Sequence, residues 1–224
     1  MNEKLTEIWD ELRQVLLGRG LLDVILPPLL FVLLNSWVGF TVAVWGAGGT
    51  AVLFLIVRWL RKQPIKAALG GVLSVALAAA VALLLDREEG FFLPTIVSGG
   101  VTVLLAVGSV VAKRPLVAWS SFITRRWPLD WYWHPQVRPA YTEVTWLWAA
   151  YFLARLLGQL FFFQAGAVDR LAWLNLLLGW PGILLLLIIT YVYGTWRLRH
   201  LAGPSVAEFK AGTPPPWQSQ RKGF

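Results

Sequence analysis

The sequence contains no cysteine, and its only histidines are His134 and His200. The lack of cysteine excludes disulfides, thiolate nucleophiles and cysteine metal sites. The two histidines are not spaced as a pair of metal ligands, and the sequence has no paired-aspartate magnesium motif, glycine-rich phosphate loop or nucleophile elbow. We therefore expect a protein that is not an enzyme and that holds no metal and no cofactor.

Charged residues are also scarce, at 14% of 224 residues, whereas 57% are hydrophobic and 14 are tryptophan. The mean hydropathy of +0.62 lies far outside the range of a soluble domain. The sequence thus predicts an all-α, polytopic membrane protein. Its formal net charge of +8 is then a signal of membrane topology, and we expect no nucleic-acid partner.

Six apolar runs reach about the 20 residues that a transmembrane helix needs. We place the six transmembrane helices at 21–39, 41–60, 66–85, 91–112, 144–164 and 172–194. A short uncharged turn at 35–39 separates the first two, because one helix over 21–60 would be about twice as long as the bilayer is thick. We expect the six spans to form one membrane domain over residues 21–199.

The basic residues predict the orientation of these spans. All but three of the 20 Lys and Arg residues fall in the N-terminal segment, the second and fourth loops, or the tail. The exceptions are Arg87, Arg155 and Arg170. Because cytoplasmic loops are enriched in Lys and Arg, we expect both the N- and C-termini to be cytoplasmic.

Three segments flank the spans on the predicted cytoplasmic side. Residues 1–20 show an amphipathic helical pattern, which favours either an interfacial helix in the membrane surface or a helix packed on the protein's own loops. The loop 113–143 is rich in aromatic residues and predicts an interfacial segment, while the tail 200–224 is expected to be poorly ordered unless a partner holds it. Within the loop we single out Arg125, Arg126 and Trp127. These side chains either contact the headgroups of anionic lipid or serve as a topology anchor with an aromatic belt.

The fifth span carries a charge, Arg155, near the middle of the bilayer. A buried arginine costs several kcal/mol unless it meets water, an anion or backbone carbonyls. Polar and aromatic side chains share its helical face or its depth in the membrane, and these are Thr145, Trp148, Gln159, Thr50, Ser98 and Thr102. Two interpretations stay open: these residues bind an anionic solute or lipid, or Arg155 pairs with carbonyls and fixes the packing of the helices.

A second polar position lies early in the first span. Pro27 and Pro28 each remove a helical hydrogen bond, and Asp23 lies one turn before them. The three residues either line a gate or proton path, or they only kink the helix.

Several motifs resemble those of a known family. They are GRGLLD at 18–23, LP at 26–27, KRPL at 113–116 and YTEVTWLW at 141–148, followed by Arg155 and Gln159. These residues resemble the bacterial membrane family called domain of unknown function 3159, which is distantly similar to intracellular septation protein A, an inner-membrane protein linked to the cell envelope and division. The resemblance covers roughly 18–195 and implies a six-span protein of the bacterial plasma membrane, without catalytic residues to carry over.

These observations favour a non-catalytic subunit or scaffold of a bacterial envelope or other membrane assembly. The expected partners are the lipid bilayer, a protein partner or a second copy of the chain, and anionic lipid as a further candidate. The alternative is a small transporter or channel for an anionic solute or lipid that uses Arg155. A solvent-connected cavity at Arg155 would favour transport, whereas a dry, packed Arg155 would favour the scaffold.

Overall fold

The structure is a computed structural model that describes residues 21–60, 62, 66–220 and 223–224, with the backbone alone for 21–28 and 66–68. Every regular element among these residues is a helix, which confirms the predicted all-α class. The amphipathic segment predicted over 1–20 lies outside the described residues. The described chain divides into two compact units, and the single membrane domain over residues 21–199 stays a prediction.

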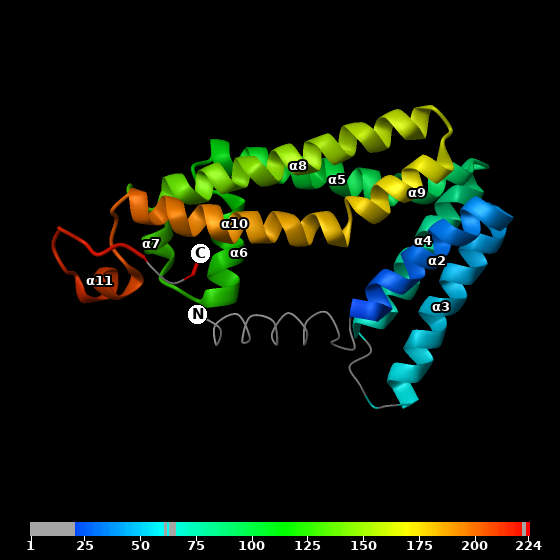
Figure 1. Ribbon diagram of the computed structural model, residues 1–224, viewed down its shortest axis with the longest axis horizontal. Coiled ribbons are helices and arrows are strands. Elements are labelled where there is room, and N and C mark those ends of the chain that lie inside the picture. Colours follow the sequence, from blue (N-terminus) through cyan, green and yellow to red (C-terminus); the bar gives the residue numbers. More distant parts are fainter. Residues whose placement is uncertain (1–20, 61, 63–65, 221–222) are drawn as a thin grey trace, which may run out of the picture. The chain divides into compact units, whose positions relative to one another are not determined.

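The first unit runs to Pro94 and includes Phe161–Trp180. Its elements are α2 (Leu21–Val38), α3 (Phe40–Leu60), α4 (Lys66–Leu85), η1 (Glu88–Phe92) and α9 (Val168–Leu177). Helices α2 and α3 form a hairpin that turns at Gly39, where the sequence predicts the break (Figure 1). Gly39 has a φ of +102°, a conformation that favours glycine, and its amide donates to the Leu34 carbonyl at 3.2 Å.

Phenylalanine rings and small residues pack the first unit. The rings of Phe31 and Phe91 stack with centroids 4.9 Å apart, and Phe40 and Phe92 meet them edge-on. A Cβ atom on Gly46 would overlap the Leu34 side chain, so glycine at this position lets α3 approach α2 closely. A hydrogen bond also joins α2 to α9. The Asn35 Nδ2 atom of α2 donates to Asp169 Oδ1 of α9 at 2.6 Å.

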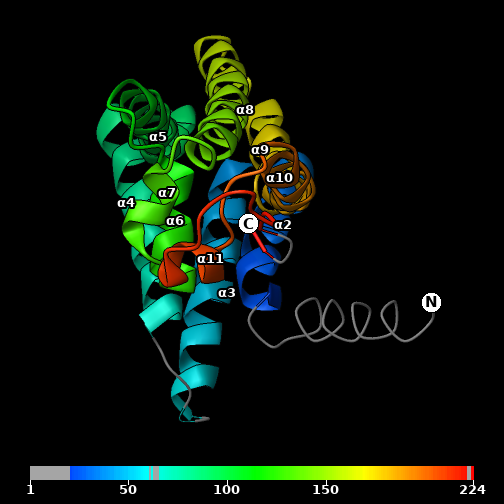
Figure 2. The ribbon, with the colours of Figure 1, turned by 90° about the vertical axis from the view of Figure 1, so that its left-hand side faces the viewer.

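The second unit comprises Thr95–Leu160 and Pro181–Phe224. Its elements are α5 (Leu93–Val111), α6 (Leu116–Arg125), α7 (Leu129–Trp133), α8 (Arg138–Gln164), α10 (Trp180–His200) and α11 (Val206–Ala211), with the first residues of α5 and α10 and the last of α8 assigned to the first unit. The long helices α5, α8 and α10 run side by side, and α6, α7 and α11 gather at one end of them (Figures 1 and 2). The unit is therefore a three-helix bundle with a helical cap.

Four segments of the described chain are long and apolar enough to cross a membrane. They are Phe40–Leu60, Glu88–Val111, Arg138–Gln164 and Val168–His200, which correspond to the second, fourth, fifth and sixth predicted spans. The runs at 21–39 and 66–85 form the helices α2 and α4, whose side chains are described over Leu29–Val38 and Leu69–Leu85. Four candidate spans indicate a membrane protein, and the count of six stays a prediction.

The cap of the second unit contains an aromatic core. Trp131, Tyr132 and Tyr141 are fully buried, and the Trp131 indole donates to the Pro204 carbonyl at 2.8 Å. The sequence predicts an interfacial position for the aromatic residues of this loop. The structure buries Trp131 and Tyr132 of α7 in one cluster with Tyr141 and Val144 of α8, and the interfacial position of the loop stays a prediction.

The described part of the tail contains one short helix, α11. Ser205 and Glu208 form a reciprocal capping box at the start of α11, and Gly212 ends the helix with a φ of +64°. Farther on, the Phe224 ring stacks on Tyr141 with centroids 4.4 Å apart. These contacts attach the described part of the tail to the cap.

Candidate functional site

Arg155 and Gln159 lie one turn apart on α8, inside the packing of the second unit. The Gln159 side chain is 1% exposed, and the Arg155 side chain is half-buried with its Nε atom fully buried. A Cβ atom on Gly99 of α5 would lie 3.6 Å from Gln159 Oε1. Glycine at this position therefore lets α5 lie close against the buried amide of Gln159, whereas Arg155 is only partly buried.

Two other residues of the predicted site join helices to one another. Thr145 is fully buried, donates to the Tyr141 carbonyl at 2.7 Å and accepts from the Val117 amide at 3.3 Å, which connects α8 to α6. The Trp148 indole donates to Thr190 Oγ1 at 2.8 Å, which connects α8 to α10. Both side chains therefore have structural hydrogen bonds within the bundle.

The three remaining hydroxyl residues of the prediction belong to different units. The Thr50 hydroxyl donates to the Gly46 carbonyl of its own helix at 2.8 Å, and the Thr102 hydroxyl donates to the Ser98 carbonyl at the same distance. Thr50 belongs to the first unit, whereas Ser98 and Thr102 belong to the second. The structure therefore brings Arg155 and Gln159 together but does not place all three hydroxyl residues in one unit with them.

A charged cluster that the sequence analysis missed joins α8 to α10. Glu143 accepts two hydrogen bonds from the Arg197 guanidinium, at 2.7 Å to Oε2 and 2.8 Å to Oε1. The Tyr193 hydroxyl donates to Glu143 Oε2 at 2.8 Å. A bidentate carboxylate–guanidinium pair is stronger and more directional than a single contact, so the cluster fixes the register of the two helices. The 54 positions between Glu143 and Arg197 leave no local sequence signal for the pair.

The residues predicted to contact lipid headgroups have different surroundings. Arg125 Nε donates to the Phe224 carbonyl at 3.0 Å, and its guanidinium lies 4.9 Å from the centre of the Trp127 ring. Arg126 ends α6 with a φ of +54°, and its side chain is exposed. Arg125 and Trp127 thus make contacts within the protein, and both Arg125 and Arg126 are exposed.

Titratable side chains of the cap are affected by burial. Burial raises the pKa of Tyr132, whose hydroxyl also pairs with Ser121 at 3.2 Å. Burial lowers the pKa of His134, which packs edge-on against Phe209 and Trp217. The described residues contain no group of three or more His, Asp or Glu side chains that could hold a metal ion.

The gate-or-kink prediction concerns Asp23, Pro27 and Pro28. All three fall in the first part of α2, where the described structure is helical backbone and the side chains lie outside the described residues. Neither the gate nor the kink is tested there.

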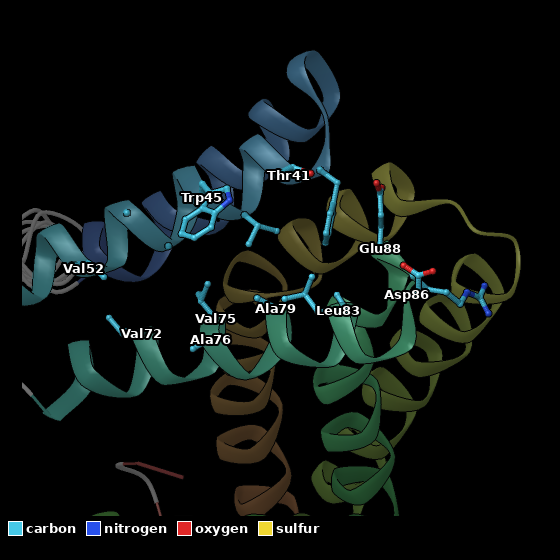
Figure 3. Close-up of a pocket in the computed structure, with 16 residues that line it drawn as sticks. Thr41, Trp45, Val52, Val72, Val75, Ala76, Ala79, Leu83, Asp86 and Glu88 are labelled. Atoms are coloured by element: carbon cyan, nitrogen blue, oxygen red, sulfur yellow. The ribbon is translucent and has the colours of Figure 1, made fainter.

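A cavity of about 830 Å³ lies within the first unit, between α3 and α4. Figure 3 shows Trp45 directed from α3 toward α4, and Val75, Ala79 and Leu83 directed from α4 toward α3. Asp86, Arg87 and Glu88 line one end of the cavity. None of the residues that the sequence analysis selected as a site lines it.

Comparison with known proteins places the chain in a family without a described activity. No curated protein and no solved structure matches the chain. Residues 18–199 match the sequence profile of a family described as "Protein of unknown function" (DUF3159), in agreement with the resemblance found in the sequence. Since the match covers most of the chain, the protein belongs to the DUF3159 family.

Proposed function

We propose that this protein is a non-catalytic subunit or scaffold of a membrane assembly in the bacterial plasma membrane. The polar contacts of α8 support the proposal most directly. Thr145, Trp148 and Glu143 each bond to a neighbouring helix of the second unit. Hydrogen bonds of this kind stabilise a fixed bundle, which suits a protein whose role is to hold others in place.

The proposal includes six spans with both termini in the cytoplasm. The chain lacks cysteine, so a single introduced cysteine reports its own side of the membrane. We expect a membrane-impermeant thiol reagent to label Arg87→Cys in intact cells and to label Arg126→Cys only after the cells are made permeable. Labelling of both variants in intact cells would contradict this topology.

The scaffold proposal is tested by isolating the full chain from its own membrane in mild detergent and measuring the mass of the intact complex. We expect a complex of fixed stoichiometry, with a second copy or another protein, that survives the substitution Arg155→Leu. Leu157→Ala, an exposed position on the same helix, serves as the matched control. A monomer that retains an anion only when Arg155 is present would contradict the scaffold.

The alternative function is transport of an anionic solute or lipid. One observation favours it, because Gln159 is buried beside the cationic Arg155, and polar groups at such depth often mark a substrate path. Vesicles that contain the wild-type protein would then move an anion, and those that contain Arg155→Leu would not. The relation to intracellular septation protein A, and with it a role at the cell envelope during division, also stays a proposal.

A further inference from the structure

The cavity between α3 and α4 has the length of one membrane leaflet. Its lining extends from Phe40 to Val52 on α3, and from Val72 on α4 to Asp86 directly after that helix. At 1.5 Å per residue, these stretches are about 18 and 21 Å long. Half of a bilayer, with its headgroups included, is about 20 to 22 Å thick. The cavity therefore matches the dimension of a lipid molecule along the membrane normal.

The walls of the cavity are apolar and its middle part is formed by small residues. Gly48 and Gly49 of α3 face Ala76 and Ala79 of α4, and the exposed Trp45 stands beside them. A helix 21 Å long and 10 Å wide would fill roughly 1,600 Å³, about twice the volume of the cavity. An acyl chain is slimmer than a helix, so a lipid suits a cavity of this volume better than a helix does.

The charged end of the cavity is held in a defined conformation. The Asp86 amide donates to the Leu83 carbonyl and the Arg87 amide to the Ala82 carbonyl, at 3.3 and 3.2 Å, which is the pattern of a Schellman motif at the end of α4. Asp86 has a φ of +52°, at a position that glycine usually takes. An aspartate in this strained position places a carboxylate at the mouth of the cavity.

The mouth carries charges of both signs. The Arg87 side chain is 52% exposed, lies 3.5 Å from Glu89 and packs over the Phe163 ring. Asp86 and Glu88, the residues directly before and after Arg87, are both exposed. A headgroup with phosphate alone would meet more carboxylates than guanidinium groups, whereas one that also carries an ammonium group complements both signs.

We propose that this cavity binds a phospholipid whose headgroup carries a phosphate and a primary amine, as in phosphatidylethanolamine. The acyl part fills the space between α3 and α4, Arg87 contacts the phosphate, and Asp86 and Glu88 contact the ammonium group. The site belongs to the first unit and is distinct from Arg155. It extends the proposed function by a specific lipid ligand.

The test uses the full chain in detergent micelles that contain equal amounts of phosphatidylethanolamine and phosphatidylglycerol with identical acyl chains. Retained lipid is counted by mass spectrometry of the intact protein. Gly49→Leu places a large side chain in the cavity, because Gly49 lines it. Gly71→Leu is the matched control, because Gly71 does not line the cavity. A Cβ atom at either glycine meets nothing within 4 Å. A second variant, Asp86→Asn with Glu88→Gln, changes only exposed side chains and so leaves the packing intact.

We expect the wild type and Gly71→Leu to retain phosphatidylethanolamine preferentially, and Gly49→Leu to retain about tenfold less. In the variant with both carboxylates removed, the preference for phosphatidylethanolamine over phosphatidylglycerol should be about fivefold smaller. A change of about fivefold is the upper range for exposed ion pairs. Equal retention of the two lipids by the wild type would overturn the proposal. So would lipid retention that Gly49→Leu leaves unchanged, or a lipid-free dimer that Gly49→Leu dissociates, since the cavity would then hold a second copy.

Discussion

The cluster of Glu143, Arg197 and Tyr193 allows the strength of one helix–helix contact to be predicted. Hydrogen bonds to charged groups contribute about 1.5 to 3 kcal/mol each, and two join Glu143 to Arg197. Both side chains are about one third exposed, at 34% and 31%, so solvent weakens the pair. We therefore expect a coupling free energy of about 1 to 2 kcal/mol, above the 0.2 to 1 kcal/mol of an exposed pair.

The coupling is measured by a double-mutant cycle with Glu143→Gln, Arg197→Met and the two changes together. Unfolding is followed by tryptophan fluorescence as the fraction of denaturing detergent in mixed micelles increases. Tyr193→Phe removes one hydrogen bond to the same carboxylate and should cost about 0.5 to 1.5 kcal/mol. A coupling free energy below about 0.3 kcal/mol would refute the view that this pair fixes α8 against α10.

Three further predictions follow from other contacts. Thr145→Val should destabilise the protein by about 1 to 3 kcal/mol in the same unfolding assay, because it leaves the Val117 amide without its acceptor. Gly46→Val should cost about 1 to 3 kcal/mol, because the new side chain overlaps Leu34, and an unchanged unfolding midpoint would show that the helices are farther apart. Burial lowers the pKa of the His134 imidazole below its ordinary value of 6.5. The neutral imidazole therefore makes its full contribution to the stability of the folded state above pH 6.5, and this contribution is lost as the pH falls through the lowered pKa. Faster proteolysis of the tail near pH 5 than near pH 7.5 in the wild type, but not in His134→Gln, is the expected result.

The sequence predicts the helical class well because hydrophobic runs alone determine it. The turn at Gly39 follows from the length limit on one span, and four predicted spans correspond to long apolar segments of the structure. Composition does not separate a membrane interface from a protein interior, since both are rich in Trp and Tyr. The burial of Trp131 and Tyr132 therefore could not be predicted from the aromatic content of the loop.

Other features had a local signal that the sequence analysis did not use. Ser205 followed three residues later by Glu208, with Gly212 beyond, is the pattern of a capped short helix, and it would have predicted α11. The pair of Glu143 and Arg197 and the cavity between α3 and α4 have no such signal. They depend on how separate helices approach, which periodicity within one helix does not specify.

The state of Gln159 tests the central claim that the polar residues of α8 are packed within a fixed bundle. Because the chain has no cysteine, Gln159→Cys introduces one reporter at a position that is 1% exposed. We predict that a small water-soluble thiol reagent labels Arg126→Cys in permeable membranes but leaves Gln159→Cys unlabelled until the protein is unfolded. Rapid labelling of Gln159→Cys in the folded protein would reveal a water-filled path beside Arg155 and would contradict the scaffold in favour of transport.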